Sequence, residues 1–233
     1  MIFIRKLGAA VALFTALSTI VIAPAAAKDN AYAAAVDISK IVPPPPDAAA
    51  TRAELDLMVK RQAERTPEQE ARAIADEKRN ARQFLTGAGI DVRKRDVELL
   101  EALVKRMRAS ESLVMKPAKR LFHRERPFVG DKRILVLSKT PTSESYPSSH
   151  AAFGGMVGTV LARMLPEERK AIEARIQDFA DSRVIAGAHH PSDVAAGVKV
   201  GVAIADALFE DPSFRKDYSA ARSQLRLALK LPL

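Results

Sequence analysis

A histidine and a carboxylate near residue 190 are spaced for nucleophilic chemistry. His189 and Asp193 are four residues apart, across the start of a helix that Pro191 predicts. A carboxylate at this spacing can accept a hydrogen bond from one imidazole nitrogen, which fixes the tautomer and leaves the other nitrogen free. Arg183 precedes them and offers planar donors suited to an oxyanion. Taken alone, the pair is equally typical of a structural histidine–aspartate contact.

A second histidine follows two serines at a predicted helix start. Ser148 and Ser149 precede His150, and an apolar segment continues to about residue 165. The first backbone N–H groups of a helix and the positive end of its dipole together favour an anion. A serine N-cap beside an incidental histidine explains this segment equally well.

Two cations upstream share one predicted helix face. Lys119 and Arg126 are seven residues apart, almost two helical turns, and Pro127 then ends the helix. Such a pair could hold a polyanion, although a solvated basic face is the commoner meaning of this pattern. Arg124, between them, is expected to add positive potential at the mouth of a site.

The three clusters together are more specific than any one of them. They supply three cations, two histidines, one carboxylate and a helix N-terminus, which is what phosphoryl transfer without a metal requires. The remaining histidines, His123 and His190, are expected to be mainly structural or to line the pocket.

The composition excludes several other chemistries. The 233 residues include no cysteine, which rules out disulfides, cysteine-ligated metals and a cysteine nucleophile. Lysine and arginine number 37 against 28 acidic residues, for a net charge of +9. A basic protein that binds an anionic surface or nucleic acid fits that charge. However, no basic run exceeds a few residues and the aromatic residues form no stacking pattern, so no specific nucleic-acid partner is expected.

Residues 1–27 have the layout of a secretory signal peptide. Arg5 and Lys6 precede an uncharged apolar run over 7–22, Pro24 breaks that run, and Ala27 ends a small-residue cleavage site. The alternative is an uncleaved membrane anchor. Cleavage predicts a periplasmic or secreted protein with no stable membrane insertion.

The rest of the chain predicts a Pro-rich linker over 28–50 and one all-α domain over 51–233. Helix starts are expected at a capping box of Thr51 and Glu54, at Thr66 and at several prolines. A separate helical stretch is expected over about 110–125, with Pro117 as a kink or a new first turn. A long loop follows over 127–147, in which residues 134–137 could form a short strand.

In this order, the clusters resemble the signature of the type 2 phosphatidic acid phosphatase superfamily. The matching segments are Lys119 with Arg126-Pro127, then Pro147 to His150, then Ser182-Arg183 with His189 and Asp193. Within that superfamily the chain is most similar to bacterial class A non-specific acid phosphatases. The resemblance covers roughly residues 50–225 and implies a single-domain helical bundle, all-α, of the phosphatase and haloperoxidase type.

The resemblance implies a role for each matching residue. His189 would attack phosphorus, Asp193 would orient His189, and His150, protonated at the start, would act as general acid and then base. The phosphate-binding residues would be Lys119, Arg126, Ser148, Ser149 and Arg183. It also implies an acid pH optimum, a small phosphomonoester substrate, no metal or other cofactor, inhibition by vanadate or phosphate, and a possible homo-oligomer.

One position departs from the family pattern, because Ser149 stands where the family has glycine. Serine keeps the backbone N–H, so activity is expected to survive unless the position requires a positive φ. The alternative enzyme class with this constellation is the vanadate-dependent haloperoxidases. Their chains are generally much longer.

Overall fold

A computed structural model describes residues 31–137 and 139–233, and within them the fold is entirely helical. The predicted all-α class is therefore confirmed, whereas the predicted signal peptide lies outside the described residues. The α-helices are α1 Ala48–Ala63, α2 Pro67–Ala75, α3 Ala81–Gly87, α4 Glu98–Phe122, α5 Pro127–Gly130, α6 Ser149–Met164, α7 Arg169–Ile185, α8 Pro191–Leu208 and α9 Pro212–Ala228. Three 3₁₀ turns are η1 Ile38–Lys40, η2 Lys94–Asp96 and η3 Pro166–Glu168.

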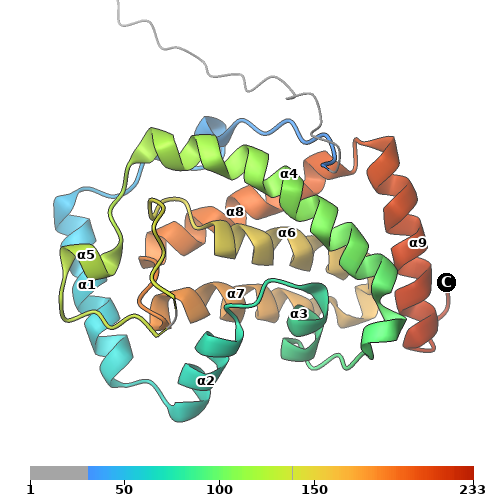
Figure 1. Cartoon of the computed structure of the whole chain (residues 1–233), viewed down its shortest axis with the longest axis horizontal. Coiled ribbons are helices and arrows are strands. Elements are labelled where there is room, and N and C mark those ends of the chain that lie inside the picture. The colour runs from blue at the N-terminus through green and yellow to red at the C-terminus, as the bar shows by residue number, and fades with distance from the viewer. Residues whose placement is uncertain (1–30, 138) are drawn as a thin grey trace, which may run out of the picture.

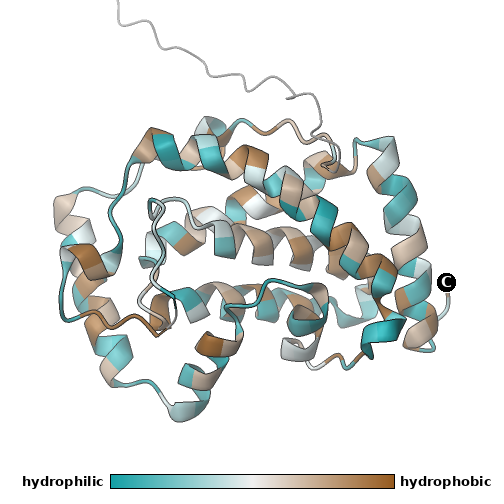
Figure 2. Ribbon diagram, viewed as in Figure 1, coloured by the Kyte–Doolittle hydropathy of each residue, from teal (hydrophilic) through white to brown (hydrophobic). Residues whose placement is uncertain are grey.

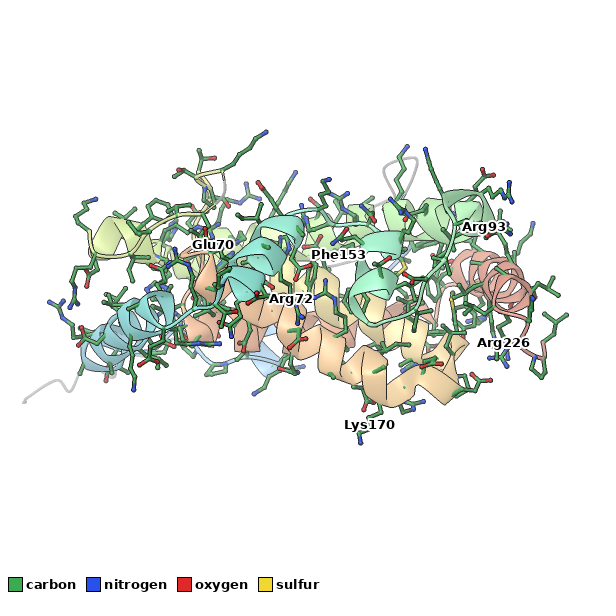
Figure 3. The ribbon with its side chains drawn as sticks, turned by 90° about the horizontal axis from the view of Figure 1, so that it is seen from below. Glu70, Arg72, Arg93, Phe153, Lys170 and Arg226 are labelled. Atoms are coloured by element: carbon green, nitrogen blue, oxygen red, sulfur yellow. The ribbon has the colours of Figure 1, made fainter. Side chains whose placement is uncertain are left out.

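Helices α6, α7 and α8 form the centre of the molecule, with α4 crossing over them and α9 closing one end (Figure 1). α6 and α8 are rich in small and apolar residues on all sides, as expected for buried helices. Hydropathy follows this arrangement, since teal residues are more frequent on α9 than on α6 (Figure 2). Phe153 of α6 lies in the interior, whereas Lys170 of α7 projects outward (Figure 3).

Glycines let α6 and α8 approach until their backbones touch. A Cβ atom on Gly197 would lie 2.3 Å from the carbonyl oxygen of Ser148, and one on Gly201 would lie 2.1 Å from that of Ala152. The Ser148 N–H also donates to the Asp193 carbonyl at 3.0 Å. The first turns of these two helices are therefore held side by side.

Capping signals were partly correct as guides to the helix starts. The Thr66 capping box is confirmed: its hydroxyl accepts from Gln69 N at 3.2 Å, and the Gln69 amide accepts from Thr66 N at 2.9 Å. The predicted box at Thr51 is wrong, because α1 begins at Ala48. Asp47 is its N-cap, since it follows the proline run directly and accepts from Ala50 N at 2.9 Å.

The predicted break near residue 110 is also wrong. α4 runs continuously from Glu98 to Phe122 with Pro117 inside it. Proline removes one helical hydrogen bond and costs about 3 kcal/mol in a helix interior. The buried stripe on α4 is continuous across the proline, with Val114 and Met115 before it and Ala118 after it, and this packing holds the helix together.

The segment before α1 packs on the domain, in contrast to the linker expected over 28–50. Tyr32, Val36, Ile38 and Val42 are buried in the main core. The Tyr32 hydroxyl donates to Asp217 of α9 at 2.7 Å. We call residues 31–47 the strap. Apolar residues spaced irregularly between alanines and prolines gave no periodic signal for this contact.

The loop that follows α4 contains the short helix α5 and then irregular backbone. Residues 134–137 do not form a strand. The side-chain amide of Gln62 donates to Leu135 O at 2.8 Å and accepts from Leu135 N at 3.0 Å, in place of a neighbouring strand. Within the described residues, no helix has the length and apolarity needed to cross a bilayer.

Candidate active site

A cavity of about 380 Å³ lies where the ends of α4, α6 and α7 meet. Six of the predicted site residues line it: Lys119, Arg126, Ser149, His150, Arg183 and His189. The other lining residues are Glu77, Arg79, Ala188 and residues 139–143. A broader hollow of about 770 Å³ lies beside α1 and α5 and contains none of the predicted site residues.

His189 presents one ring nitrogen to a cation and the other to a carboxylate. Arg126 Nη1 lies 2.8 Å from its Nε2 and 3.3 Å from its Nδ1, and Nδ1 also lies 3.4 Å from Asp193 Oδ2. The Asp193 carboxylate only accepts, so this contact assigns the proton to Nδ1 and the lone pair to Nε2. Burial, and then the charge of Arg126, lowers the pKa of His189 from 6.5 to about 3. The imidazole is therefore neutral and nucleophilic at Nε2.

The turn before His189 depends on a glycine. Gly187 has φ +71°, and a Cβ there would lie 2.1 Å from Leu135 O. This left-handed residue ends α7 so that the N–H groups of Ala188 and His189 both reach Arg183 O, at 3.0 and 3.3 Å. The turn thus places His189 beside Arg183.

Asp193 is fully buried behind His189. Its Oδ2 accepts from Ser145 Oγ at 2.5 Å and from the His190 N–H at 2.9 Å. Burial by itself raises the pKa of Asp193, but hydrogen bonds from His189 and His190 and the charge of Arg124 outweigh it, holding that pKa well below its usual range. Nδ1 of His190 lies 3.2 Å from the same oxygen, and this histidine is buried and is not among the residues that line the cavity.

Three buried cations line the cavity without a carboxylate partner among the described residues. Lys119 donates to Glu144 O at 2.6 Å, Arg126 to Ala188 O at 2.7 Å, and Arg183 to Ala73 O. None of the three forms an ion pair with a carboxylate in the described part of the chain. Burial lowers the pKa of Lys119 to about 7 and those of Arg126 and Arg183 to about 10. Positive charge that is buried and left uncompensated favours an anion.

The N-terminus of α6 completes this anion site. Ser148 is the N-cap, and its hydroxyl accepts from Ala151 N at 3.2 Å. Across residues 31–137 and 139–233, the N–H groups of Ser149 and His150 have no backbone or side-chain acceptor. Ser149 is the first helical residue and does not have a positive φ, so serine is unstrained there. Ser148 itself is buried and is not among the residues that line the cavity, so its role as a phosphate ligand stays a prediction.

His150 is held by two contacts that the sequence did not reveal. Its Nε2 lies 2.5 Å from Asp76 O, and its ring stacks on Phe179 with centroids 4.6 Å apart. Nε2 therefore donates to Asp76, and Nδ1 is the nitrogen left for the cavity. Burial, followed by the charges of Arg183 and Arg79, lowers the pKa of His150 well below 6.5. A protonated His150 in the free site, as expected from the resemblance, is thus disfavoured.

The C-terminal end of helix α2 provides backbone acceptors for two residues of the cavity. Its last carbonyls include those of Ala73, which binds Arg183, and Asp76, which binds His150. The Asp76 carboxylate is buried and pairs with Arg175 and with Ser182 Oγ at 2.7 Å. No sequence spacing relates α2 to the three clusters, so only the tertiary fold shows this role.

Two other expectations are corrected. Arg124 is buried against Asp193 and Glu54 instead of lying at the mouth of the site, because the chain turns after α4 and directs it beneath α8. His123 ends α4 in the left-handed conformation with φ 46°, and its side chain is 73% exposed. Among the described residues, no cluster of three or more histidine, aspartate or glutamate side chains is arranged to hold a metal ion.

Comparison with known proteins agrees with this geometry. Residues 106–217 match the PAP2 superfamily. The chain is 32% identical over 151 residues to an acid phosphatase of Zymomonas mobilis, covering 63% of this chain and 57% of the relative. Non-specific acid phosphatases of Salmonella typhimurium and Providencia stuartii are 36% and 30% identical over 112 and 149 residues. Those two matches cover 46% and 62% of this chain, and 45% and 60% of the relatives.

The matches thus span between about half and three fifths of each relative's length. The family match contains every residue of the three clusters, from Lys119 to Asp193. This region of the chain, residues 106–217, is therefore similar to the PAP2 superfamily.

Proposed function

We propose that the protein is an exported acid phosphatase that hydrolyses small phosphomonoesters without a metal, through a phosphohistidine. The observation that carries the proposal is a neutral His189 that lines the same cavity as three buried cations, none of which has a carboxylate partner among the described residues. The names of the relatives support the same activity.

In the proposed reaction, three phosphate oxygens are bound by Lys119, Arg126, Arg183 and the free N–H groups of α6. Arg126 leaves Nε2 of His189 to bind an oxygen, and Nε2 attacks phosphorus in line. The N–P bond forms as the bond from phosphorus to the ester oxygen breaks. Asp193 accepts from Nδ1–H and stabilises the positive charge that develops on the ring.

Nδ1 of His150 transfers the proton in both steps. It first protonates the leaving alcohol oxygen. It then removes a proton from the water that cleaves the N–P bond, and this cleavage returns His189 to its neutral form. Because the free site disfavours a protonated His150, we propose that this proton arrives with the substrate. A phosphomonoester retains one proton at pH values below its second pKa of about 6, and this explains an acidic pH optimum for the activity.

The decisive experiment measures hydrolysis of p-nitrophenyl phosphate by the purified protein in the presence of a chelator. We expect activity that is highest in mildly acidic buffer, inhibited by vanadate and phosphate, and absent in His189→Ala. His123→Ala is the matched control, because that histidine is exposed and lies outside the cavity. Activity that requires an added divalent metal, or that survives in His189→Ala, contradicts the proposal.

Two further measurements test the intermediate and the export. Brief reaction with a ³²P-labelled ester followed by alkaline quench is expected to trap an acid-labile phosphohistidine in the native protein and none in His189→Ala. Mass spectrometry of protein from the periplasm or medium is expected to find a chain that begins at Lys28. A full-length chain retained in the membrane contradicts signal cleavage.

A further inference from the structure

We propose that Arg124 and Glu54 form a positioning pair that fixes Asp193 and, through it, His189. This inference rests on the proposed function. It concerns a residue in the spacer of the first cluster and another on α1, which lies before the region that matches the family.

Arg124 binds the carboxylate oxygen of Asp193 that does not contact His189. Its Nη1 donates to Asp193 Oδ1 at 2.6 Å, whereas His189, His190 and Ser145 all gather at Oδ2. It is the one partner of Oδ1 in the described part of the chain. Arg124 thus sets the rotation of the carboxylate, and that rotation decides whether Oδ2 meets Nδ1 of His189.

Glu54 fixes Arg124 in turn and joins α1 to the start of α8. Its Oε2 accepts from Arg124 Nη2 at 2.8 Å and from Ser192 Oγ at 2.9 Å, and its Oε1 accepts from the Ser192 N–H at 2.7 Å. The guanidinium therefore spans two carboxylates, one on α1 and one on α8. Both carboxylates and Arg124 are largely withdrawn from solvent, with side chains at most 16% exposed.

Charge gives Arg124 a second effect on Asp193. The groups that face this carboxylate are His189, His190 and Arg124, with Arg126, Lys119 and Tyr146 near enough to interact electrostatically. Arg124 is the only permanent cation in direct contact with Asp193 within the described residues. Its removal leaves a buried carboxylate short of positive charge, which favours the protonated acid.

The test compares Arg124→Met with Arg120→Met. Arg120 is exposed on the same helix and makes no side-chain hydrogen bond or ion pair within the described residues, so its loss removes the same charge without the contacts. For Arg124→Met we expect kcat to fall by about 10- to 100-fold, the size typical of losing an orienting partner. The inhibition constant for phosphate stays within about threefold, because the three phosphate cations are intact. In the plot of kcat against pH for Arg124→Met, we expect the fall in kcat on the acidic side to begin at a higher pH than in the native protein.

Glu54→Ala and Glu54→Gln extend the test if Arg124→Met does not fold. Alanine removes the acceptor for Arg124, and we expect kcat to fall by about threefold to tenfold without an upward shift of the acid limb. Glutamine keeps an acceptor oxygen and is expected to restore most of that loss. Unchanged kcat in Glu54→Ala, a folded Arg124→Met that behaves like Arg120→Met, or an equal loss in phosphate affinity overturns the proposal.

Imidazole ¹⁵N spectra separate this inference from the proposed function. In the native protein we expect the His189 proton on Nδ1 with a shift typical of a hydrogen bond to a carboxylate, and in Arg124→Met a shift toward a weaker bond. This readout needs no turnover. Absence of phosphatase activity in the native protein refutes the function, whereas an unchanged His189 spectrum in Arg124→Met refutes the positioning pair.

Discussion

Lys119 is a cation whose charge depends on pH near neutrality. Burial and the neighbouring charge of Arg126 place its pKa at about 7, so its ammonium is present below that pH and lost above it. Its Nζ is already oriented by Glu144 O at 2.6 Å. Anion binding should therefore weaken as the pH rises, independently of the proton that the substrate carries.

The pH dependence of inhibition by sulfate tests this expectation, because sulfate keeps both of its negative charges between pH 6 and pH 8. We expect its inhibition constant to rise by about tenfold between pH 6 and pH 8, the cost of losing one charge-assisted hydrogen bond. Lys119→Met is expected to bind sulfate weakly at every pH, with a flat profile. A native profile that is equally flat contradicts a titrating Lys119.

Ser149→Gly tests the departure from the family pattern. The backbone there is helical and its N–H is free, so glycine keeps the anion contact and loses only the hydroxyl at the cavity wall. We expect kcat within about threefold of the native value and KM raised by about threefold, the value of one neutral hydrogen bond. A fall in KM shows instead that the hydroxyl crowds the substrate.

At the residue scale, the motifs predicted the cavity well but not its support. Six of the eight predicted site residues line it, and Asp193 lies behind His189 as expected. Ser148 caps α6 and is not among the residues that line the cavity. A hydroxyl at a helix start can either cap the helix or face a ligand, and spacing does not distinguish these roles. Asp76, Arg124 and Glu54 act through contacts 69 to 106 residues apart in sequence, which no local pattern encodes.

At the scale of elements, the contact between α6 and α8 carries the geometry of the site. Gly197→Ala would place a methyl group 2.3 Å from Ser148 O and separate the two helix starts. We expect the free energy of unfolding to fall by about 1–3 kcal/mol, and kcat to fall because His150 and Asp193 move apart. Urea unfolding and steady-state kinetics measure both effects.

Gly130→Ala serves as the control for this variant. Its Cβ would meet only Leu55 Cδ1 at 3.9 Å, an ordinary contact, and the residue does not have a positive φ. We expect stability and kcat to be close to native. If Gly197→Ala is equally benign, the backbones of α6 and α8 have room to separate without loss.

The starts of most helices could be predicted, because prolines and caps act locally. Pro191 and Pro212 begin α8 and α9 as expected, and Thr66 caps α2. The break between α2 and α3 and the continuity of α4 through Pro117 could not be predicted, because tertiary packing decides both.

At the scale of the whole molecule, the strap joins the start of the described chain to its last helix. Tyr32 is 2% exposed, packs edge-on against Phe214 with ring centroids 5.2 Å apart, and lies beneath the guanidinium of Arg106. Its backbone N–H donates to Ser110 Oγ at 2.9 Å. The sequence predicted a linker because prolines and alanines in this segment carry no helical or strand period.

Tyr32→Ala measures what the strap contributes. We expect the free energy of unfolding to fall by about 3–5 kcal/mol, as for other buried aromatic residues, with kcat unchanged in the folded protein. Tyr32→Phe removes only the hydrogen bond to Asp217 and is expected to cost about 1 kcal/mol. Thermal unfolding compares the two, and a Tyr32→Ala protein as stable as the native one shows that the strap is a linker after all.

The glycine contact between α6 and α8 also restricts how the site can move. Two helices whose backbones touch have no side chains between them to repack, so they must move as one rigid body and keep His150 and Asp193 in register. Outside the helices, the cavity wall includes Glu77 and Arg79, between α2 and α3, residues 139–143, and Arg126, Ala188 and His189. If the site opens to exchange a ligand, the two segments that are not joined to α6 or α8, at residues 77–79 and 139–143, are therefore the parts of the wall expected to move.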